Sequence, residues 1–375
     1  MKRPAFAVVA ATVAALAIAA CGSTKPAAQT ATTSKPITAA WIYVGSPSDA
    51  GWTHQHDVGR LAVQQYFGSK VKTIYKENVP EGPQTAQVIN ELINSGAKII
   101  FATSFGYQPA MLAAAKTHPS IYFAQATGTD MAANLSEYGA AGEDADYLAG
   151  MAAGFATKTG KIGFVAPFPI PEVIREIDSY TMGARYVHPG ATVKVVWTNS
   201  WFNPATERSA AQSLVASGVD VLGDGVDDPT VGEVAETNGL KWTGYDSNQN
   251  TFAPKAFQTA TVYNWNQYYI NSVKAAMSGT FKSSFTYGNI ADNMINIAPF
   301  GSTVSAKAQA AITKREAEIR AGTFNPFAGP LTKQNGTAGL PAGQTLPVYN
   351  LSSPSALSRY TLNWFVQGVI GSAQG

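Results

Sequence analysis

Two histidines, an aspartate and a tryptophan crowd the stretch SPSDAGWTHQHDVGR, residues 46–60. Imidazole nitrogens bind metals and transfer protons, so His54 and His56 raise the question of a metal or catalytic centre. Their spacing argues against a shared metal, because two residues two positions apart on a helix point about 200° away from each other. Asp49 and Trp52 instead suit a binding surface, in which a carboxylate edge lies beside an aromatic face. We expect these two residues to contact a ligand, and His56 is the histidine that could also reach it.

A second candidate for chemistry is the carboxylate group of Asp224, Asp227 and Asp228 in GDGVDDP, residues 223–229. The ligand spacing of an EF-hand is absent, so we expect these residues to begin a helix and to contact a ligand. The chain has no G-x-S-x-G elbow, Walker loop, H-E-x-x-H pair or dinucleotide glycine fingerprint. Glycoside hydrolysis needs two facing carboxylates, which spacing alone cannot place. We therefore expect no enzyme activity, no metal and no cofactor.

Aromatic, carboxylate and amide side chains follow six apolar runs that we predict as strands. The stretches that carry these side chains are 46–52, 103–107, 167–169, 199–202, 223–228 and 246–248. A single aromatic side chain after a strand usually packs into the core, but six successive cases indicate a lined cleft. Faces for stacking on a planar ring come from Trp52, Phe105, Phe168 and Trp201. Polar partners that could orient the ligand are Asp49, Ser104, Asn199, Asp227, Asp246 and Asn248. Sugars are held by the same residue types, so a carbohydrate is a second possible ligand.

The elements that position these residues alternate between short apolar runs and longer amphipathic segments. Predicted strands are 37–44, 71–75, 98–102, 121–124, 161–165, 192–197, 219–222 and 240–245. Helices are predicted to end near residues 67 and 116 and to cover 82–95 and 144–157. This alternation predicts an α/β fold with parallel sheets covered on both faces, and the number of strands favours two doubly wound lobes. Such sheets bind ligands beyond the carboxyl ends of their strands. The Gly- and Pro-rich residues 322–348 are expected to form a surface excursion, and 360–370 a final helix.

The composition excludes several classes of partner. Of 375 residues, 45% are hydrophobic, and 26 basic against 24 acidic residues leave a net charge of +2. A chain so near neutrality, with its charges scattered, has no electrostatic footprint for nucleic acid or for acidic lipid. Its length suggests about two domains.

The N-terminus has the pattern of a targeting segment. Lys2 and Arg3 precede an apolar run over residues 5–20 that is too short to span a bilayer comfortably. The run ends at Cys21, the only cysteine in the chain, so residues 1–21 resemble a bacterial lipoprotein signal peptide in which the cysteine is lipidated. A plain secretory signal is the alternative. Residues 22–37 are rich in Ser, Thr, Ala and Pro and are expected to form a flexible tether.

Several motifs in this order resemble the basic membrane lipoprotein family, the purine-nucleoside-receptor-like substrate-binding proteins of ABC importers. The resemblance covers about residues 38–375, and its motifs are VGSPSDAGWTHQHDVGR, ATSFGY, EDADYLAGMAAG, KIGFVAPFPIPEVIREID, NSWFNPATERSAAQSL, GVDVLGD, TGYDSNQ, NPFAGPL and WFVQGVIG. It implies a type I periplasmic-binding fold, in which two lobes are joined by three crossovers and close about a hinge. The lobes implied are 38–137 plus 262–289 and 138–261 plus 290–375.

The resemblance also implies roles for site residues. Trp52 takes the place of the aromatic residue that stacks on a base, and Phe168 or Trp201 supplies the opposite face. Asp246 corresponds to the aspartate that grips ribose hydroxyls in nucleoside binders. Residues 44–46 and 259–265 lack an aspartate and a lysine of the nucleoside-binding branch. The D-A-G-W motif is therefore more similar to binders of a free purine base such as adenine.

The function implied is that of a lipid-anchored receptor for a purine nucleobase or a related flat heterocycle. It would act on the extracytoplasmic face of the bacterial cell membrane and deliver its ligand to an ABC permease with its ATPase subunits. The alternatives are a nucleoside or sugar receptor of the same fold and, from another class, a surface hydrolase of nucleosides or glycosides.

Overall fold

The computed structural model describes residues 36–375. The predicted signal peptide with Cys21, whose lipidation is a prediction, and residues 22–35 of the predicted tether lie outside this range. The last predicted tether residue, Ile37, is instead the first residue of a strand. Within residues 36–375, no helix combines the length and the hydropathy needed to cross a bilayer.

The first lobe is built on a six-stranded sheet within the described range, and every neighbouring pair in it is parallel. Its order is β11-β5-β4-β3-β1-β2. The strands are β1 (Ile37–Ile42), β2 (Val71–Lys76), β3 (Ala97–Ala102), β4 (Tyr122–Ala126), β5 (Leu135–Ala140) and β11 (Phe285–Gly288).

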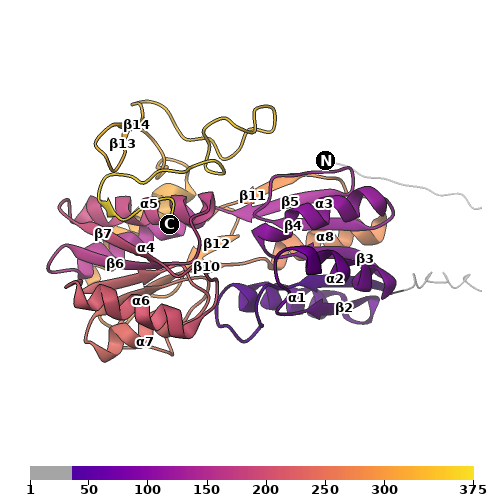
Figure 1. Ribbon diagram of the computed structural model, residues 1–375, viewed down its shortest axis with the longest axis horizontal. Coiled ribbons are helices and arrows are strands. Elements are labelled where there is room, and N and C mark those ends of the chain that lie inside the picture. Colours follow the sequence, from indigo (N-terminus) through magenta and orange to yellow (C-terminus); the bar gives the residue numbers. More distant parts are fainter. Residues whose placement is uncertain (1–35) are drawn as a thin grey trace, which may run out of the picture. The chain divides into compact units, whose positions relative to one another are not determined.

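Helices cover both faces of this sheet, as a parallel sheet requires (Figure 1). They are α1 (Trp52–Phe67), α2 (Pro83–Asn94), α3 (Gln108–Thr117) and α8 (Asn266–Ser278). Alternate residues of β1 enter two different cores: Trp41 packs with residues of α1 and α8, whereas Ile42 packs with residues of α2 and α3. Because both faces are buried, the central strands are continuous apolar runs.

The second lobe is built on a seven-stranded sheet of order β12-β10-β9-β8-β6-β7-β15, again counted within residues 36–375. Only the β10–β12 pair is antiparallel in it. The strands are β6 (Lys161–Ala166), β7 (Thr192–Trp197), β8 (Val221–Asp224), β9 (Lys241–Gly244), β10 (Phe257–Tyr263), β12 (Ile295–Ile297) and β15 (Val369–Ile370). The helices are α4 (Gly142–Ala156), α5 (Pro171–Val187), α6 (Pro204–Ala216), α7 (Thr230–Thr237) and α9 (Ala306–Arg320).

Helices α4 and α5 pack unusually closely against each other. A Cβ atom at Gly150 would lie 2.0 Å from the carbonyl oxygen of Tyr180, and one at Gly183 would lie 2.0 Å from that of Tyr147. Only glycine can occupy these two contact points without pushing the helices apart. Helix α4 is buried over almost its whole length, so the repeated small residues of AGMAAG serve core packing.

Three crossovers connect the lobes. They run from β5 to α4, from β10 to α8, and from β11 to β12. The lobe boundaries expected after residues 137 and 261 fall inside β5 and β10.

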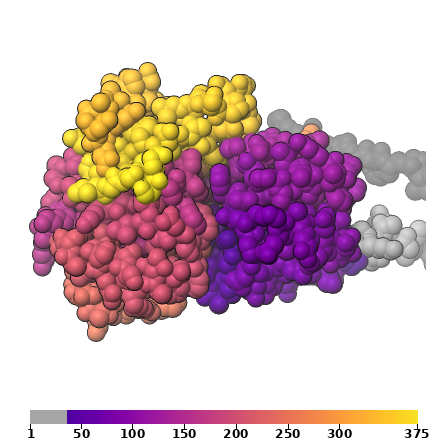
Figure 2. Space-filling view, viewed as in Figure 1, coloured from indigo at the N-terminus to yellow at the C-terminus, as the bar shows by residue number. Residues whose placement is uncertain are grey.

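The residues after α9 form a C-terminal segment, 323–375, that lies mainly on the second lobe. It carries a hairpin of β13 (Leu331–Thr332) and β14 (Ala338–Leu340) and then β15, which pairs with β7. Figure 2 shows this segment in yellow and orange over the second lobe, reaching the edge of the first. The contact with the first lobe is aromatic, because the rings of Tyr349 and Tyr360 lie 5.5 and 5.3 Å from that of Phe285 in β11.

The helix predicted for residues 360–370 is wrong. These residues form turns, a bridge between Val366 and Lys333, and strand β15. Gly368 adopts a φ of 106°, which a helix cannot contain, and β7 offers an unpaired edge that the chain fills. The apolar residues that suggested a helix, including Leu362 and Phe365, are buried in the core beside α5. The surface excursion predicted for 322–348 lacks helices and contains the hairpin.

Candidate ligand-binding site between the two lobes

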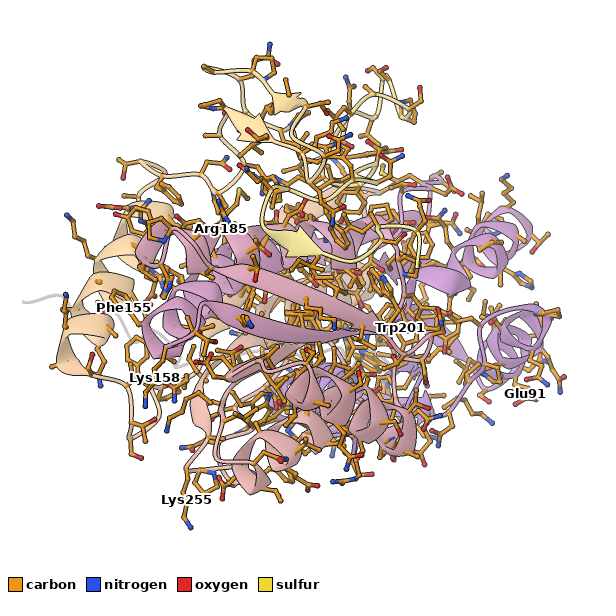
Figure 3. The ribbon with its side chains drawn as sticks, turned by 60° about the vertical axis from the view of Figure 1, so that its left-hand side comes forward. Glu91, Phe155, Lys158, Arg185, Trp201 and Lys255 are labelled. Carbon is orange, nitrogen blue, oxygen red and sulfur yellow. The ribbon has the colours of Figure 1, made fainter. Side chains whose placement is uncertain are left out.

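A narrow cavity lies where the carboxyl ends of the two sheets face each other, within about 380 Å³ of space that is free of protein atoms and includes open solvent. Its lining comes from both lobes and consists of Val44, Trp52, Ser104, Phe105, Thr127, Glu172, Val173, Trp201, Asp227 and Tyr245. We call this space the ring cavity. In Figure 3, Trp201 lies beyond the end of the second sheet's strands, on the side of the first lobe. This position is the one that the strand-end rule for parallel sheets predicts.

Trp52 is held rigidly in the wall of the ring cavity. Its indole N–H donates a hydrogen bond of 2.6 Å to the carbonyl oxygen of Thr103. Its ring meets those of His56, Tyr263 and Trp265 nearly at right angles, with centroids 4.6, 5.1 and 5.7 Å away. Edge-to-face contacts of this kind are favourable and orient the ring. Trp52 is therefore a preorganised aromatic surface at the cavity.

Asp49 does not line the ring cavity, although the sequence suggested a ligand contact. Its carboxylate accepts hydrogen bonds of 2.9 Å from the backbone N–H groups of Gly51, Thr53 and His54. These groups at the start of α1 have no partner inside the helix, so the carboxylate stabilises the helix terminus. Asp49 thereby positions Trp52, the first residue of α1, from behind the cavity wall.

The start of α1 also touches the second lobe directly. A Cβ atom at Gly51 would lie 2.1 Å from the carbonyl oxygen of Asp227. The carbonyl oxygen of Ala50 accepts hydrogen bonds from the hydroxyl of Ser247 and, at 3.3 Å, from Nε2 of Gln249. The lobes are therefore closed onto each other at this point, which we call the Gly51 contact.

Asp227 is the polar group of the ring cavity with the most unusual environment. It is 2% exposed, and its Oδ2 atom has no hydrogen-bond partner within the described residues. Burial, reinforced by the neighbouring Asp49, raises the pKa of Asp227 well above its usual range. Asp246 is also buried, and desolvation and the charge of Asp227 raise the pKa of its carboxyl in the same direction. The site therefore contains carboxyl groups that favour the protonated form.

The remaining predicted residues fall at different depths. Ser104 and Phe105 line the ring cavity together with Trp201, whose buried Nε1 atom has no partner in the described chain. Phe168 meets the Trp201 ring edge-to-face, with centroids 5.1 Å apart, and lines a wider space of about 680 Å³ at the cavity mouth. Asn199 lines the same mouth.

Besides Asp49 and Phe168, three further predicted site residues lie outside the ring cavity. His56 is completely buried behind Trp52, and its Nδ1 atom lies 2.6 Å from the hydroxyl oxygen of Tyr269. Asn248 is exposed, and its Oδ1 accepts a bond from the backbone N–H of Asn250. Asp246 adjoins the cavity residue Tyr245 but does not line the space itself. The other two members of the acidic group, Asp224 and Asp228, bond to Trp242 Nε1 and to the backbone N–H of Thr230.

Sequence reasoning missed half of the cavity lining, namely Val44, Thr127, Glu172, Val173 and Tyr245. Thr127 and Tyr245 follow β4 and β9, so the strand-end rule could have found them. Glu172 and Val173 lie in the first turn of α5, inside the motif KIGFVAPFPIPEVIREID but beyond the strand-end residues 167–169, and neither was singled out as a site residue. Glu172 accepts a weak bond of 3.5 Å from Arg175 Nη2, and burial raises the pKa of its carboxyl.

Backbone strain also marks the site. Non-glycine residues with positive φ follow five strands near the cavity and its mouth, namely Ala50, Asn78, Thr127, Asn199 and Asp246. Left-handed backbone costs free energy in residues other than glycine, and it concentrates where function demands a particular geometry. The strained positions therefore indicate the same region as the cavity does.

Within residues 36–375, no group of three or more His, Cys, Asp or Glu residues is arranged to hold a metal ion.

Comparison with known proteins gives a consistent result. A family model described as "ABC transporter substrate-binding protein PnrA-like" matches residues 37–322. A purine-binding protein of Brucella abortus is 37% identical over 329 residues, covering 88% of this chain and 91% of its own. A Haloferax volcanii protein, named as a candidate glucose-binding protein of an ABC transporter, is 32% identical over 78% of this chain and 74% of its own.

Among solved structures, a solute-binding protein of an ABC transporter from Aeropyrum pernix superposes with a TM-score of 0.68. The match covers 77% of this chain and 93% of that one at 14% identity, so it bears on the fold alone. It agrees with the type I periplasmic-binding fold.

Proposed function

The chain belongs to the PnrA-like substrate-binding proteins of ABC transporters, and from that premise we propose that its ring cavity captures a purine nucleobase, adenine-like, or a related flat heterocycle. Members of this family are extracytoplasmic receptors that bind a small molecule and present it to a permease and its ATPase subunits. The proposed role for this chain is capture and delivery without chemical change of the ligand.

The observation that carries the proposal is the composition of the ring cavity. Aromatic rings enter it from both lobes, Trp52 and Phe105 from the first, Trp201 and Tyr245 from the second. A flat heterocycle gains about 1–3 kcal/mol from stacking on each such ring. The immobilised Trp52 ring offers this surface without an ordering cost when the ligand binds.

Asp227 supports an adenine-like edge. A protonated carboxyl offers one donor and one acceptor side by side, and burial favours that form of Asp227. The adenine edge carries a donor, the 6-amino group, next to an acceptor ring nitrogen, so the two can form a paired hydrogen bond. The adjacent N1–H and 2-amino donors of guanine match an ionised carboxylate, so protonation of Asp227 removes that guanine-specific pairing, whereas guanine can still pair through N1–H and O6. The unpartnered indole N–H of Trp201 supplies a further donor for a ring nitrogen.

The Brucella relative, whose name describes a purine-binding protein and which is 37% identical over most of both chains, supports the same ligand class. The Haloferax relative favours a second candidate, a sugar. Aromatic faces beside carboxylates suit both, so the ligand has to be tested directly.

The test is calorimetric titration of the purified full chain, freed of co-purifying ligand, with adenine, guanine, adenosine, ribose and glucose. We expect saturable one-to-one binding of adenine that exceeds binding of guanine and glucose. Chromatography of the mixture after prolonged incubation should return the ligand unchanged. Binding of glucose alone would replace the purine by a sugar, and catalytic appearance of a product would replace the receptor by a hydrolase.

We further propose that Cys21 is lipidated and that residues 22–36 tether the folded part to the membrane. The support is the sequence, in which small residues precede the single cysteine after an apolar run. The test is fractionation of cells that express the chain or its Cys21→Ala variant. The unaltered chain should sediment with membranes and carry labelled fatty acid, and the variant should carry none.

A further inference from the structure

A stretch near the end of the chain, residues 359–370, contacts both lobes, and we call it the strap. Its last strand, β15, pairs with β7 of the second lobe. The backbone N–H of Val366 donates a 2.8 Å hydrogen bond to the buried side chain of Asp178 in α5. Leu362 and Phe365 are buried in the core of the second lobe. Most of the strap is therefore anchored on the second lobe.

Tyr360, two positions before Leu362, packs on the first lobe instead. Its ring lies against those of Phe285 and Tyr287 in β11, with centroids 5.3 and 5.7 Å away. Its buried hydroxyl lies over β5, where a Cβ atom at Gly139 would come within 2.6 Å of the hydroxyl oxygen. The two strands lead into two of the three crossovers, from β5 to α4 and from β11 to β12. The strap is thus seated on the hinge.

The carboxylate of Glu143 fastens the strap beside the first of these crossovers. Glu143 is completely buried in the first turn of α4. Its Oε1 atom accepts a 2.5 Å hydrogen bond from Nη1 of Arg359, and its Oε2 atom accepts one of 3.2 Å from Nε of Arg175 in α5. The hydroxyl of Tyr287 in β11 also donates to it, at 2.7 Å. One buried carboxylate therefore joins the strap to a strand of the first lobe and a helix of the second.

The charge on Glu143 makes this junction sensitive to its geometry. Burial alone would raise the pKa of Glu143, but the charges of Arg359 and Arg175 lower it below its usual range, so the carboxylate is ionised. A buried ion whose partner moves away is left without solvent or counter-charge, which costs free energy. The contacts of Arg359 therefore favour the arrangement in which they are formed.

That arrangement is the closed one, because the lobes touch at the Gly51 contact in the same structure. Opening of the cleft turns β5 and β11 relative to α5. Since Leu362 anchors the strap on the second lobe, the Tyr360 ring has to leave its seat on β5 and β11 when the lobes turn. Opening thus disrupts contacts of the strap that closure makes.

We propose that the strap acts as a brace across the hinge, fastened by Arg359 and Tyr360, and that it keeps a closed form of the lobes populated before any ligand binds. Neither residue lines the ring cavity, so both act on ligand binding only through the equilibrium between open and closed lobes. The strap lies beyond residues 37–322, which the family model matches. The inference depends on hinge closure and not on the identity of the ligand.

The first experiment measures the radius of gyration of the ligand-free full chain by X-ray scattering. Gly139→Ala places a methyl group against the Tyr360 hydroxyl and should increase the radius of gyration. Adding Tyr360→Phe to Gly139→Ala removes the oxygen that clashes, so the double variant should return toward the unaltered chain. Gly190→Ala, where a Cβ meets nothing within 4 Å, is the control.

The second experiment removes the fastening charge. Arg359→Ala should increase the radius of gyration and, by lowering the closed population, weaken adenine binding roughly 3- to 10-fold in calorimetry. Arg359→Lys keeps the charge and should restore much of both. The matched control is Arg208→Ala, which removes an exposed arginine paired with Glu233. Urea denaturation identifies the variants that are folded, and the Gly139 pair decides the matter if Arg359→Ala is not.

The outcomes separate this inference from the proposed function. An unchanged radius of gyration in folded Gly139→Ala or in folded Arg359→Ala would overturn the brace. An increase in Gly139→Ala that persists when Tyr360→Phe is added would also overturn it, since the effect would then come from β5 alone. Absence of adenine binding to the unaltered chain would overturn the proposed function alone, because the scattering is measured without ligand.

Discussion

The imidazole of His56 and the indole of Trp265 lie face to face, with ring centroids 4.9 Å apart and planes inclined by 5°. Tyr263 stacks on Trp265 in turn, at 5.3 Å and 16°, and Trp52 meets all three rings edge-to-face. Trp265 lies in the crossover from β10 to α8. The Trp52 wall of the ring cavity therefore packs against one of the segments that join the lobes. The position of the Trp52 ring is coupled in this way to the geometry of the hinge.

His56 should make the protein less stable in mild acid. Burial holds the pKa of His56 well below its usual range. In the unfolded chain this imidazole binds a proton near pH 6.5, whereas in the folded chain it stays neutral at that pH. Stability is then lost as pH falls below about 6.5, by up to about 1.4 kcal/mol per pH unit. We expect His56→Phe, which keeps an aromatic ring in the stack, to lose less stability between pH 7 and 5 in urea denaturation. His54→Phe, at an exposed position, is the control. Equal slopes for His56→Phe and the unaltered chain would contradict the assignment.

Trp52→Ala should weaken adenine binding roughly 10- to 100-fold, because a stacking surface worth about 1–3 kcal/mol is lost. Calorimetry measures the change. The control is Trp364→Ala in the C-terminal segment, whose ring lies over Lys333 and outside the cavity. An unchanged affinity in Trp52→Ala would show that the ligand ring does not stack there.

Asp227→Asn should keep adenine binding, since an amide, like a protonated carboxyl, offers one donor and one acceptor. Asp227→Ala should weaken adenine binding roughly 3- to 30-fold by removing both hydrogen bonds.

The buried Asp227 faces Asp49, Glu207, Asp228 and Asp246, and its raised pKa has burial as its main cause. Adenine affinity of the unaltered chain should therefore fall as rising pH ionises this carboxyl, and the affinity of Asp227→Asn should not. The reverse pattern would mean that the carboxylate binds the ligand.

Gly51→Ala should hold the lobes apart. The added Cβ would fall 2.1 Å from the Asp227 carbonyl oxygen, so the Gly51 contact could not form. Because only the closed form encloses the ligand, we expect at least a roughly 10-fold loss of affinity. X-ray scattering should show a larger radius of gyration with saturating adenine. Gly190→Ala, where a Cβ meets nothing within 4 Å, is the control. A variant that closes and binds normally would show that the contact is dispensable.

Glu137→Gln should stabilise the protein, increasingly so at higher pH. Burial raises the pKa of Glu137 to about 10, and neither carboxyl oxygen has a partner among the described residues. A folded-state pKa above the unfolded one means that stability falls as pH rises from about 4.5 toward 10, by on the order of 1 kcal/mol per pH unit. Glutamine removes this dependence. Urea denaturation at pH 5, 7 and 8.5 measures it, with the exposed Glu91→Gln as control. A constant difference across this range would refute the prediction.

Local patterns predicted the α/β class, the strand ends that face the cleft, and the strands from β1 to β9 except β5. They did not predict β5, β10, β11 or β12. Runs such as KIIFA and KIGFV are apolar throughout because both faces of a parallel strand are buried, and this property is visible in the sequence. Trp52, Phe105, Trp201 and Asp227 were predicted as site residues and line the ring cavity. Their direct contact with a ligand stays a prediction.

Contacts between segments that are distant in the sequence determined the features that local patterns did not predict. Asp49 turns its carboxylate to the start of α1, and His56 faces Trp265 more than two hundred positions away in the sequence. Residues 360–368 form turns and a bridge to Lys333, and Val369 and Ile370 pair with the edge of β7 as strand β15. The raised pKa of Asp227 depends on its burial and on the nearby Asp49 of the first lobe. The periodicity of the sequence shows which residues are apolar. The hydrogen-bond partners of a side chain and its removal from water are set only when the two lobes come together, so no local sequence pattern predicts them.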